Sequence, residues 1–282
     1  MPEFTDAHGI AIVYDVHPAQ TAPRGAVQLL HGVGEHAGRY GALIERLTAE
    51  GFTVYADDHR GHGRTGMKQH GEKAKLGRLG PGGHRAAVAA VWQFTELIRE
   101  ENPGLPLILL GHSWGSFLSQ ILLNDHPEAY DAVVLSGSAL RWPGSLNAGN
   151  LNAPWKAKDA TGTEWLSSDL SVGAAFLDDP HATTVPLARL FGPIEGARVF
   201  GRPRKNLGHD IPILLMVGRD DTVGGPRSVH RLADAYRTRS GLTDITTLVY
   251  PGARHEIFNE VMQEDVRGDL VAWLDARFPA RD

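Results

Sequence analysis

The residues best suited to do chemistry are a serine, a pair of aspartates and a histidine that follow one another along the chain. Ser113 lies at the centre of a G-x-S-x-G pattern, between an apolar run at 106–110 and helically spaced apolar residues at 117–123. A serine at a strand-to-helix turn has its hydroxyl exposed, and the first amides of the helix point to the same place. The pattern alone also fits a glycine-rich connection with a capping serine. As a nucleophile, Ser113 needs a base, an acid and oxyanion donors elsewhere.

Two polar loops later in the chain contain candidates for the base and the acid. Asp220 and Asp221 follow one apolar run, and His255 follows the next. The carboxyl ends of parallel strands meet at one edge of a sheet, so we expect both loops to lie beside Ser113. A neutral imidazole can take the proton of a serine hydroxyl when a carboxylate orients the ring. The order along the chain predicts a triad of Ser113, Asp221 and His255.

The acid and the base each have an alternative interpretation. Asp221 is favoured because it lies three residues past Gly218, but Asp220 stays open. The aspartate that is not used is expected to be a surface or capping carboxylate. His255 alone also fits a loop histidine that caps the last helix.

An acyl-transfer intermediate carries an oxyanion, which needs fixed hydrogen-bond donors. One donor is expected to be the backbone N–H of Trp114, directly after the candidate nucleophile. The other is expected from the glycine-bearing loop after residues 26–30, at the N–H of Val33. The indole of Trp114 is expected to pack near the site.

The elements that position these residues alternate between strand and helix from residue 26 onward. Apolar runs predict buried strands over 26–30, 52–56, 106–110, 132–136, 211–217 and 244–250. Helical spacing predicts helices over 40–50, 86–101, 117–123, 226–238 and 259–278. Residues 9–16 predict a strand with one exposed face, and the polar stretch 57–83 is expected to be a loop. This pattern predicts an α/β fold with a mostly parallel sheet covered by helices on both faces.

The alternation breaks near residue 137. Residues 138–208 show no strong strand and only short helical pieces at 168–177 and 184–200. Such a stretch inside an α/β pattern predicts an inserted helical cap at 138–208 on a core of residues 1–137 and 209–282. Three tryptophans of the cap predict either an aromatic entrance or contacts that hold the cap on the core: Trp142, Trp155 and Trp165.

The composition excludes several function classes. A net charge of −5 and a pI near 6.3 give no basis for a nucleic-acid surface. Zero cysteines exclude disulfides, thiolate metal sites and a cysteine nucleophile, and fit a cytoplasmic protein. Neither a signal peptide nor an apolar run long enough to span a membrane is evident. The mildly apolar cap predicts no more than transient contact with a lipid surface, and the sequence does not predict the oligomeric state.

The fourteen histidines raise the question of a metal site. His59 and His62 lie three apart, but Arg60 and Gly61 separate them in an irregular stretch that suggests no third ligand. We therefore expect these histidines to hydrogen-bond within their loop, and we expect neither a metal nor a cofactor.

Four motifs together resemble one family. They are HGVGEH with RY at 31–40, DHRGHG at 58–63, GHSWG at 111–115, and YPGARHE with NE at 250–260. They are similar to the HGxGEHxxRY, D-x-R-G-H-G, GHSMG and Y-P-G-x-R-H-E…N-E motifs of monoacylglycerol lipases and bacterial lysophospholipase-like hydrolases. These proteins form the serine aminopeptidase S33 group of α/β-hydrolases, and the resemblance covers nearly the whole chain.

The resemblance implies an α/β-hydrolase fold with eight strands and a helical cap. It also implies cofactor-free ester hydrolysis through an acyl-enzyme, with Ser113, Asp221 and His255 as the triad. The amides of Val33 and Trp114 would be the oxyanion donors. Trp114 stands where the family has Met, which predicts a narrower acyl pocket. The expected substrates are monoacylglycerol-like, lysophospholipid-like or small alkyl and aryl esters.

The same fold also supports other functions. Dehalogenases and epoxide hydrolases have a carboxylate at the turn, so Ser113 speaks against both. A peptidase or amidase stays open, although the HGxGEH motif favours esters. A ligand-binding protein on an inactive scaffold is disfavoured, because all three triad residue types are present.

Overall fold

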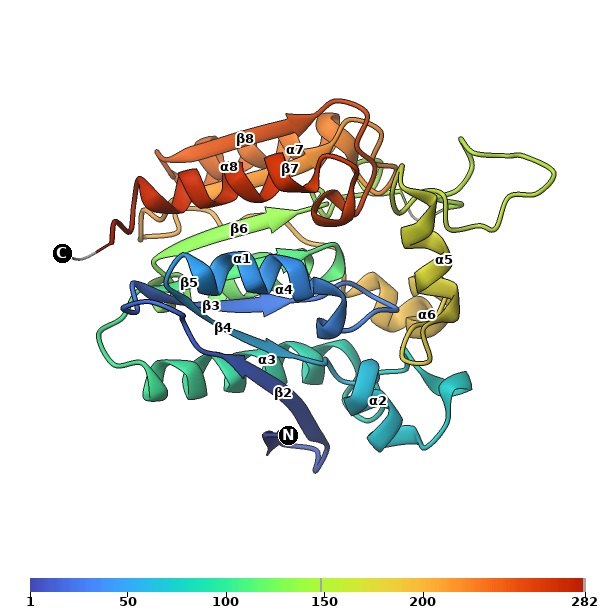
Figure 1. Cartoon of the computed structure of the whole chain (residues 1–282), viewed down its shortest axis with the longest axis horizontal. Helices are drawn as coiled ribbons and strands as arrows, with labels where there is room; N and C mark the ends of the chain where they lie inside the picture. The colour runs from blue at the N-terminus through green and yellow to red at the C-terminus, as the bar shows by residue number, and fades with distance from the viewer. Residues whose placement is uncertain (148, 281–282) are drawn as a thin grey trace.

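The computed structural model describes residues 1–147 and 149–280, and its centre is a sheet of eight strands (Figure 1). The order across the sheet is β1-β2-β4-β3-β5-β6-β7-β8. β1 and β2 pair antiparallel, as do β2 and β4, and all other neighbours are parallel. The strands are β1 (Glu3–Thr5), β2 (Ala11–His17), β3 (Gly25–Leu30), β4 (Phe52–Asp57), β5 (Leu107–His112), β6 (Ala132–Ser136), β7 (Ile213–Gly218) and β8 (Ile245–Tyr250). The predicted α/β-hydrolase sheet is confirmed.

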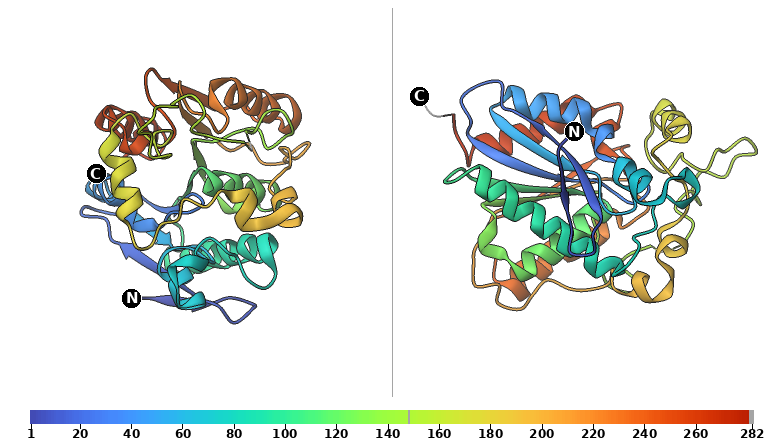
Figure 2. Two further views of the ribbon diagram at one scale, coloured as in Figure 1. Left: turned by 90° about the vertical axis from the view of Figure 1, so that its right-hand side faces the viewer. Right: turned by 90° about the horizontal axis from the view of Figure 1, so that it is seen from below.

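Helices cover both faces of this sheet (Figure 2). They are α1 (Gly41–Ala49), α2 (Gly63–His70), α3 (Gly83–Glu101), α4 (Trp114–Asp125), α5 (Leu170–Asp178), α6 (Leu187–Ala197), α7 (Gly225–Ala235) and α8 (Gln263–Asp275). α1 and α8 share a hydrophobic core with one face of the sheet, and α3, α4 and α7 share a core with the other. The central strands are buried on both faces, which is why they are apolar at nearly every position. Among the described residues, no helix is both long and apolar enough to cross a bilayer.

The stretch 57–83 differs from the prediction of a loop, because it contains α2. The helix is polar, so apolar periodicity gives no signal for it, but it ends at Gly71 in the left-handed conformation. Thr65 of α2 accepts a hydrogen bond from the amide of Val13 at 2.8 Å. Val13 is therefore buried, and the prediction that β2 has one exposed face is wrong. The short β1 also escaped prediction.

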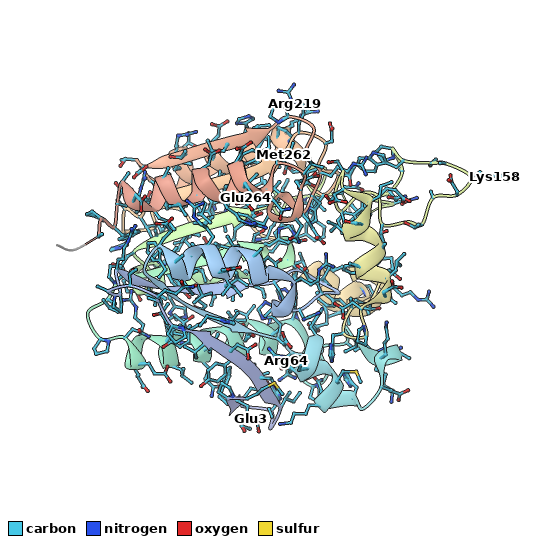
Figure 3. All side chains as sticks on the ribbon, viewed as in Figure 1. Glu3, Arg64, Lys158, Arg219, Met262 and Glu264 are labelled. Carbon is cyan, nitrogen blue, oxygen red and sulfur yellow. The ribbon has the colours of Figure 1, made fainter. Side chains whose placement is uncertain are left out.

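The segment 138–208, predicted as the cap, lies beyond the carboxyl ends of the parallel strands (Figure 1). Its described residues contain α5 and α6 but no strand. α6 is kinked at Gly192, with φ of 70°, directly before Pro193. A loop around Lys158 projects furthest from the core (Figure 3). This arrangement puts the segment over the sheet edge where the polar loops end.

Candidate active site

Ser113 occupies the turn between β5 and α4, with φ of 52° and ψ of −121°. A side chain at positive φ is strained, and the amide of Ser113 anchors the turn by donating to the carbonyl of Ser136 at 2.9 Å. A β-carbon at Gly111 would collide with the carbonyl of Gly115, and one at Gly115 would collide with the carbonyl of Leu30. The two glycines of the motif therefore allow the backbones to approach closely enough to form the turn.

His255 follows β8 and Asp221 follows β7, and their side chains meet at this edge. Nδ1 of His255 lies 2.9 Å from Oδ2 of Asp221, and Oδ1 of Asp221 accepts from the amide of Val223 at 2.7 Å. The side chains of His255 and Asp221 are 2% and 0% exposed. Asp220 is exposed. The structure therefore puts Asp221, and not Asp220, against the imidazole.

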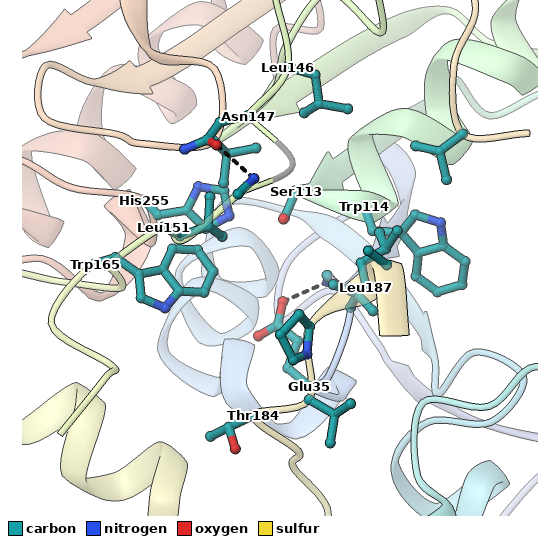
Figure 4. A pocket seen from close by; sticks show the side chains of 18 of the residues that line it. Glu35, Ser113, Trp114, Leu146, Asn147, Leu151, Trp165, Thr184, Leu187 and His255 are labelled. Carbon is teal, nitrogen blue, oxygen red and sulfur yellow. Dashed lines mark hydrogen bonds between the residues drawn. The ribbon is translucent and has the colours of Figure 1, made fainter. Parts of the chain in front are cut away.

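The imidazole of His255 is held so that its second nitrogen is available. Burial lowers the pKa of His255, but the charge of Asp221 and its hydrogen bond outweigh burial, so the pKa lies above its ordinary value. The rings of His112 and Trp165 pack against it, with centroids 4.7 and 5.0 Å away. Nε2 is buried and has no hydrogen-bond partner among the described residues. Figure 4 shows His255 and Ser113 facing each other across a cavity.

The loop after β3 brings further backbone amides to the same cavity. Glu35 Oε1 accepts from the amide of Gly32 at 2.6 Å, which fixes the loop around Val33. Val33 and Trp114 both line the cavity, and Trp114 is the first residue of α4. An amide at the first helical position has no partner within the helix. The loop and the helix can therefore present two N–H groups to one oxyanion beside Ser113.

A buried charged cluster supports this loop. Nη2 of Arg39 donates to Glu256 at 2.6 Å, and Nε of Arg39 lies 3.6 Å from Glu35. The hydroxyl of Tyr40 donates to Glu35 at 2.7 Å, and the guanidinium of Arg39 lies over the ring of Phe176 from α5. The cluster joins the loop after β3, Glu256 next to His255, and α5 of segment 138–208. Sequence reasoning assigned these residues no role, although charged residues inside an otherwise small and apolar motif were a usable signal.

The cavity beside Ser113 has a volume of about 500 Å³ and is mostly apolar (Figure 4). Its apolar wall is formed by Phe117, Leu146, Leu151, Leu166, Phe176, Val185, Leu187, Val199, Phe200 and Val223. Polar positions come from residues such as Asn147, Asn152 and Thr184. Such a cavity suits a ligand with one long apolar part and a small polar part.

Trp114 does not narrow this cavity in the way the sequence predicted. Its fully buried indole points away from Ser113, behind Leu187 (Figure 4). The indole stacks on His62 with ring centroids 5.1 Å apart, and its N–H donates to Nε2 of His84 at 3.3 Å. Although Trp114 is among the residues that line the cavity, its indole therefore leaves the space beside Ser113 open.

The histidines at 59 and 62 are built into their loop. Nδ1 of His59 pairs with Asp57 at 2.7 Å, and Nδ1 of His62 donates to the carbonyl of Arg60 at 2.9 Å. Burial lowers the pKa of His62 to about 4. These contacts fix both imidazoles inside the loop, and His62 packs on the indole of Trp114.

The three tryptophans of segment 138–208 have different surroundings. Trp165 lines the cavity and packs on His255. Trp155 lies under the guanidinium of Arg254, and Trp142, 42% exposed, lies under that of Arg202. Only Trp165 fits the predicted aromatic entrance.

Comparison with known proteins identifies the family. A family model described as serine aminopeptidase, S33, matches residues 21–262. The chain belongs to the serine aminopeptidase S33 family. A similar protein, the monoacylglycerol lipase of Mycolicibacterium smegmatis, is 32% identical over 96% of this chain and 95% of its own length.

Solved structures share the fold of this chain. The crystal structure of a carboxyl esterase from Bacillus coagulans has a TM-score of 0.86 at 23% identity, covering 98% of both chains. The monoacylglycerol lipase of Paleococcus ferrophilus has a TM-score of 0.71 at 25% identity, covering 94% of this chain and 99% of its own. The α/β-hydrolase fold is therefore shared across the whole S33 chain.

Proposed function

We propose that this chain is a serine hydrolase that cleaves carboxylic esters through an acyl-enzyme intermediate. The observation that carries the proposal is the buried pair of Asp221 and His255 at 2.9 Å, with the unpartnered Nε2 of His255 on the side of Ser113. The comparisons support the same conclusion, because similar proteins are named monoacylglycerol lipase and monoglyceride lipase.

In the proposed reaction, Nε2 of His255 takes the hydroxyl proton as Oγ of Ser113 attacks the ester carbonyl carbon. Asp221 holds the ring in the tautomer with the proton on Nδ1 and stabilises the imidazolium. The alcohol leaves with the proton from Nε2, and a water molecule then repeats the two steps on the acyl-enzyme. The chain supplies every group that these steps require, so no cofactor takes part in them.

The amides of Val33 and Trp114 are the proposed oxyanion donors. Their place at the cavity and the bond from Glu35 to the amide of Gly32 support this role. Each such donor typically lowers the barrier by about 3 kcal/mol. Fixed backbone donors lose no orientational freedom during the reaction, which is why the anchored loop matters.

The proposed substrates are esters with one apolar chain and a small polar or aromatic remainder. These include monoacylglycerol-like, lysophospholipid-like and small alkyl or aryl esters. The mostly apolar cavity of about 500 Å³ supports the apolar chain. The asparagines and threonines at the cavity wall suit the polar part.

The test uses p-nitrophenyl esters of increasing chain length, with Ser113→Ala as the variant. The variant is expected to lose at least about 10⁴-fold in kcat while its thermal unfolding stays close to that of the wild type. A fluorophosphonate is expected to label Ser113 in the folded wild type only, as read from the mass of the peptide that contains it. Full activity of Ser113→Ala would overturn the proposal. No turnover or labelling of the wild type would favour the ligand-binding alternative.

The same acyl groups on p-nitroanilide separate esterase from amidase. Ester turnover is expected to exceed anilide turnover. A higher kcat/KM on the anilides would instead assign the chain to the peptidase or amidase alternative.

We further propose that the capping segment touches lipid surfaces and that the chain acts in the cytoplasm. Among the described residues of 138–208, five large apolar side chains are exposed: Trp142, Leu170, Leu177, Ile194 and Phe200. Sedimentation with neutral lipid vesicles tests the contact. Leu170→Ser with Ile194→Ser is expected to weaken it, and Val261→Ser, also exposed but outside the segment, serves as the control.

A further inference from the structure

We infer a divalent transition-metal site, best suited to Zn²⁺, formed by His36, Asp179 and His181. One ligand atom from each residue lies within 4.8 Å of those from the other two. All three side chains are half-buried. Because His36 belongs to the core and the other two to the capping segment, the site joins parts of the chain more than 140 residues apart. The site is separate from the proposed triad.

The carboxylate of Asp179 is already oriented for such a site. Its Oδ1 accepts from the amide of His181 at 2.7 Å, and its Oδ2 lies 2.7 Å from Nε2 of His36. The rings of His36 and His181 meet edge to face, with centroids 5.5 Å apart. Oδ2 therefore points to the space that both imidazoles border. A metal would take the place of the proton now shared between His36 and Asp179.

The donor set decides which metals fit. Two imidazoles and one carboxylate are typical of zinc sites, which hold a water in the fourth position when only three protein ligands are present. Mg²⁺ and Ca²⁺ prefer oxygen ligands and would gain little from the two imidazoles. The site is therefore expected to bind Zn²⁺ and not Mg²⁺.

The surroundings accept a cation at this place. The ammonium of Lys73 donates to the backbone carbonyl of Asp179, so it leaves the carboxylate available. The guanidinium of Arg39 is paired with Glu35 and Glu256. Nδ1 of His36 now accepts a hydrogen bond from the exposed amide of Gly38 at 3.2 Å. With a metal on Nε2, Nδ1 would carry the proton, and the amide of Gly38 would donate to solvent water instead.

The site would fasten one wall of the cavity. The amide of Thr183 donates to the carbonyl of Gly34 at 2.8 Å, so the segment after Asp179 already lies on the loop that carries Val33. The same segment continues to Thr184 and Val185, which line the cavity. A bound metal would hold this wall against the core, and it would stabilise the folded state by an amount that rises with the logarithm of the free metal concentration above Kd.

The test titrates the chain, first stripped with EDTA, with ZnCl₂ and with MgCl₂ in a calorimeter. We expect one Zn²⁺ per chain, a rise in thermal midpoint with Zn²⁺ and none with Mg²⁺. His181→Ala and Asp179→Asn are each expected to lose at least about tenfold in zinc affinity. His230→Ala is the matched control, because His230 is an exposed histidine outside the site.

Three results would overturn the inference. The first is no zinc binding by the wild type. The second is a zinc affinity of His181→Ala and Asp179→Asn equal to that of the wild type. The third is a loss of zinc affinity in His230→Ala as large as in the site variants, which would mean an adventitious ion only. Unfolding of each variant in EDTA separates loss of the site from loss of the fold. None of these readouts depends on ester turnover.

Discussion

Lowering the pH from neutral to about 4.5 is expected to destabilise this protein through histidines that are buried in their neutral form. Burial lowers the pKa of His62 and of His84 to about 4. It also takes the pKa of His31 and of His112 well below the ordinary value. In the unfolded chain all four titrate near 6.5, so between these values the unfolded state binds more protons. Their contribution is intact above about pH 6.5 and is lost as the pH falls toward about 4.

The loss of stability at low pH can be worked out from His62 and His84, whose pKa values are about 4. Each such group costs about 1.4 kcal/mol of unfolding free energy per pH unit below 6.5. At about pH 4.5, His62 and His84 together cost roughly 5 kcal/mol. A typical domain is stable by only about 5–15 kcal/mol. The chain is therefore expected to come close to unfolding before most of its carboxylates are protonated.

Urea unfolding at about pH 7, 6 and 5 measures this slope. His84→Gln removes one titrating group but keeps an acceptor for the indole N–H of Trp114. Its slope is expected to fall by about 1.4 kcal/mol per pH unit relative to the wild type. His230→Gln, at an exposed position, is expected to leave the slope unchanged. A slope for His84→Gln equal to that of the wild type would refute the reasoning.

Three further predictions concern turnover of p-nitrophenyl esters. Asp221→Asn is expected to lower kcat by about 10⁴-fold and Asp220→Asn by less than a few fold, and the reverse ranking would make Asp220 the acid. Asp221 raises the pKa of His255, so kcat/KM is expected to fall as the pH drops through a value above 6.5. Asp221→Asn is expected to shift this acidic limb of the pH profile to lower pH. An acidic limb at or below pH 6.5 in the wild type would contradict the assignment. Glu35→Gln is expected to lower kcat at least about tenfold with little change in KM, because the loop before Val33 loses a charged acceptor; a change in KM alone would instead indicate a role in substrate binding.

Much of the core could be predicted because its signals are local. The buried strands carry continuous apolar runs, and β6 was predicted with the bounds that the structure has. The order Ser113, Asp221, His255 could be placed at one edge because parallel strands end there. The choice between Asp220 and Asp221 needed the fold, since only the turn after β7 decides which carboxylate reaches His255.

Other features depend on contacts between distant parts of the chain. α2 is polar, and its buried residues are the small Gly63, Thr65 and Gly66, so apolar periodicity gave no sign of it. The direction of the Trp114 indole follows from His62 and His84, which no local pattern links to it. His36, Asp179 and His181 likewise meet only because the capping segment folds back on the core.

The capping segment is also the only covalent route from β6 to β7. These strands are parallel neighbours, and a parallel pair needs a crossover of a dozen or more residues. The last part of the route runs back along the core. There the amide of Arg204 donates to Asn124 in the last turn of α4, and the amide of Leu207 donates to the carbonyl of Ser240 beyond α7. A chimera with a foreign cap must therefore be cut before residue 202 and keep this return path. Replacing all of 138–208 with a short linker would leave β7 unable to reach its place in the sheet.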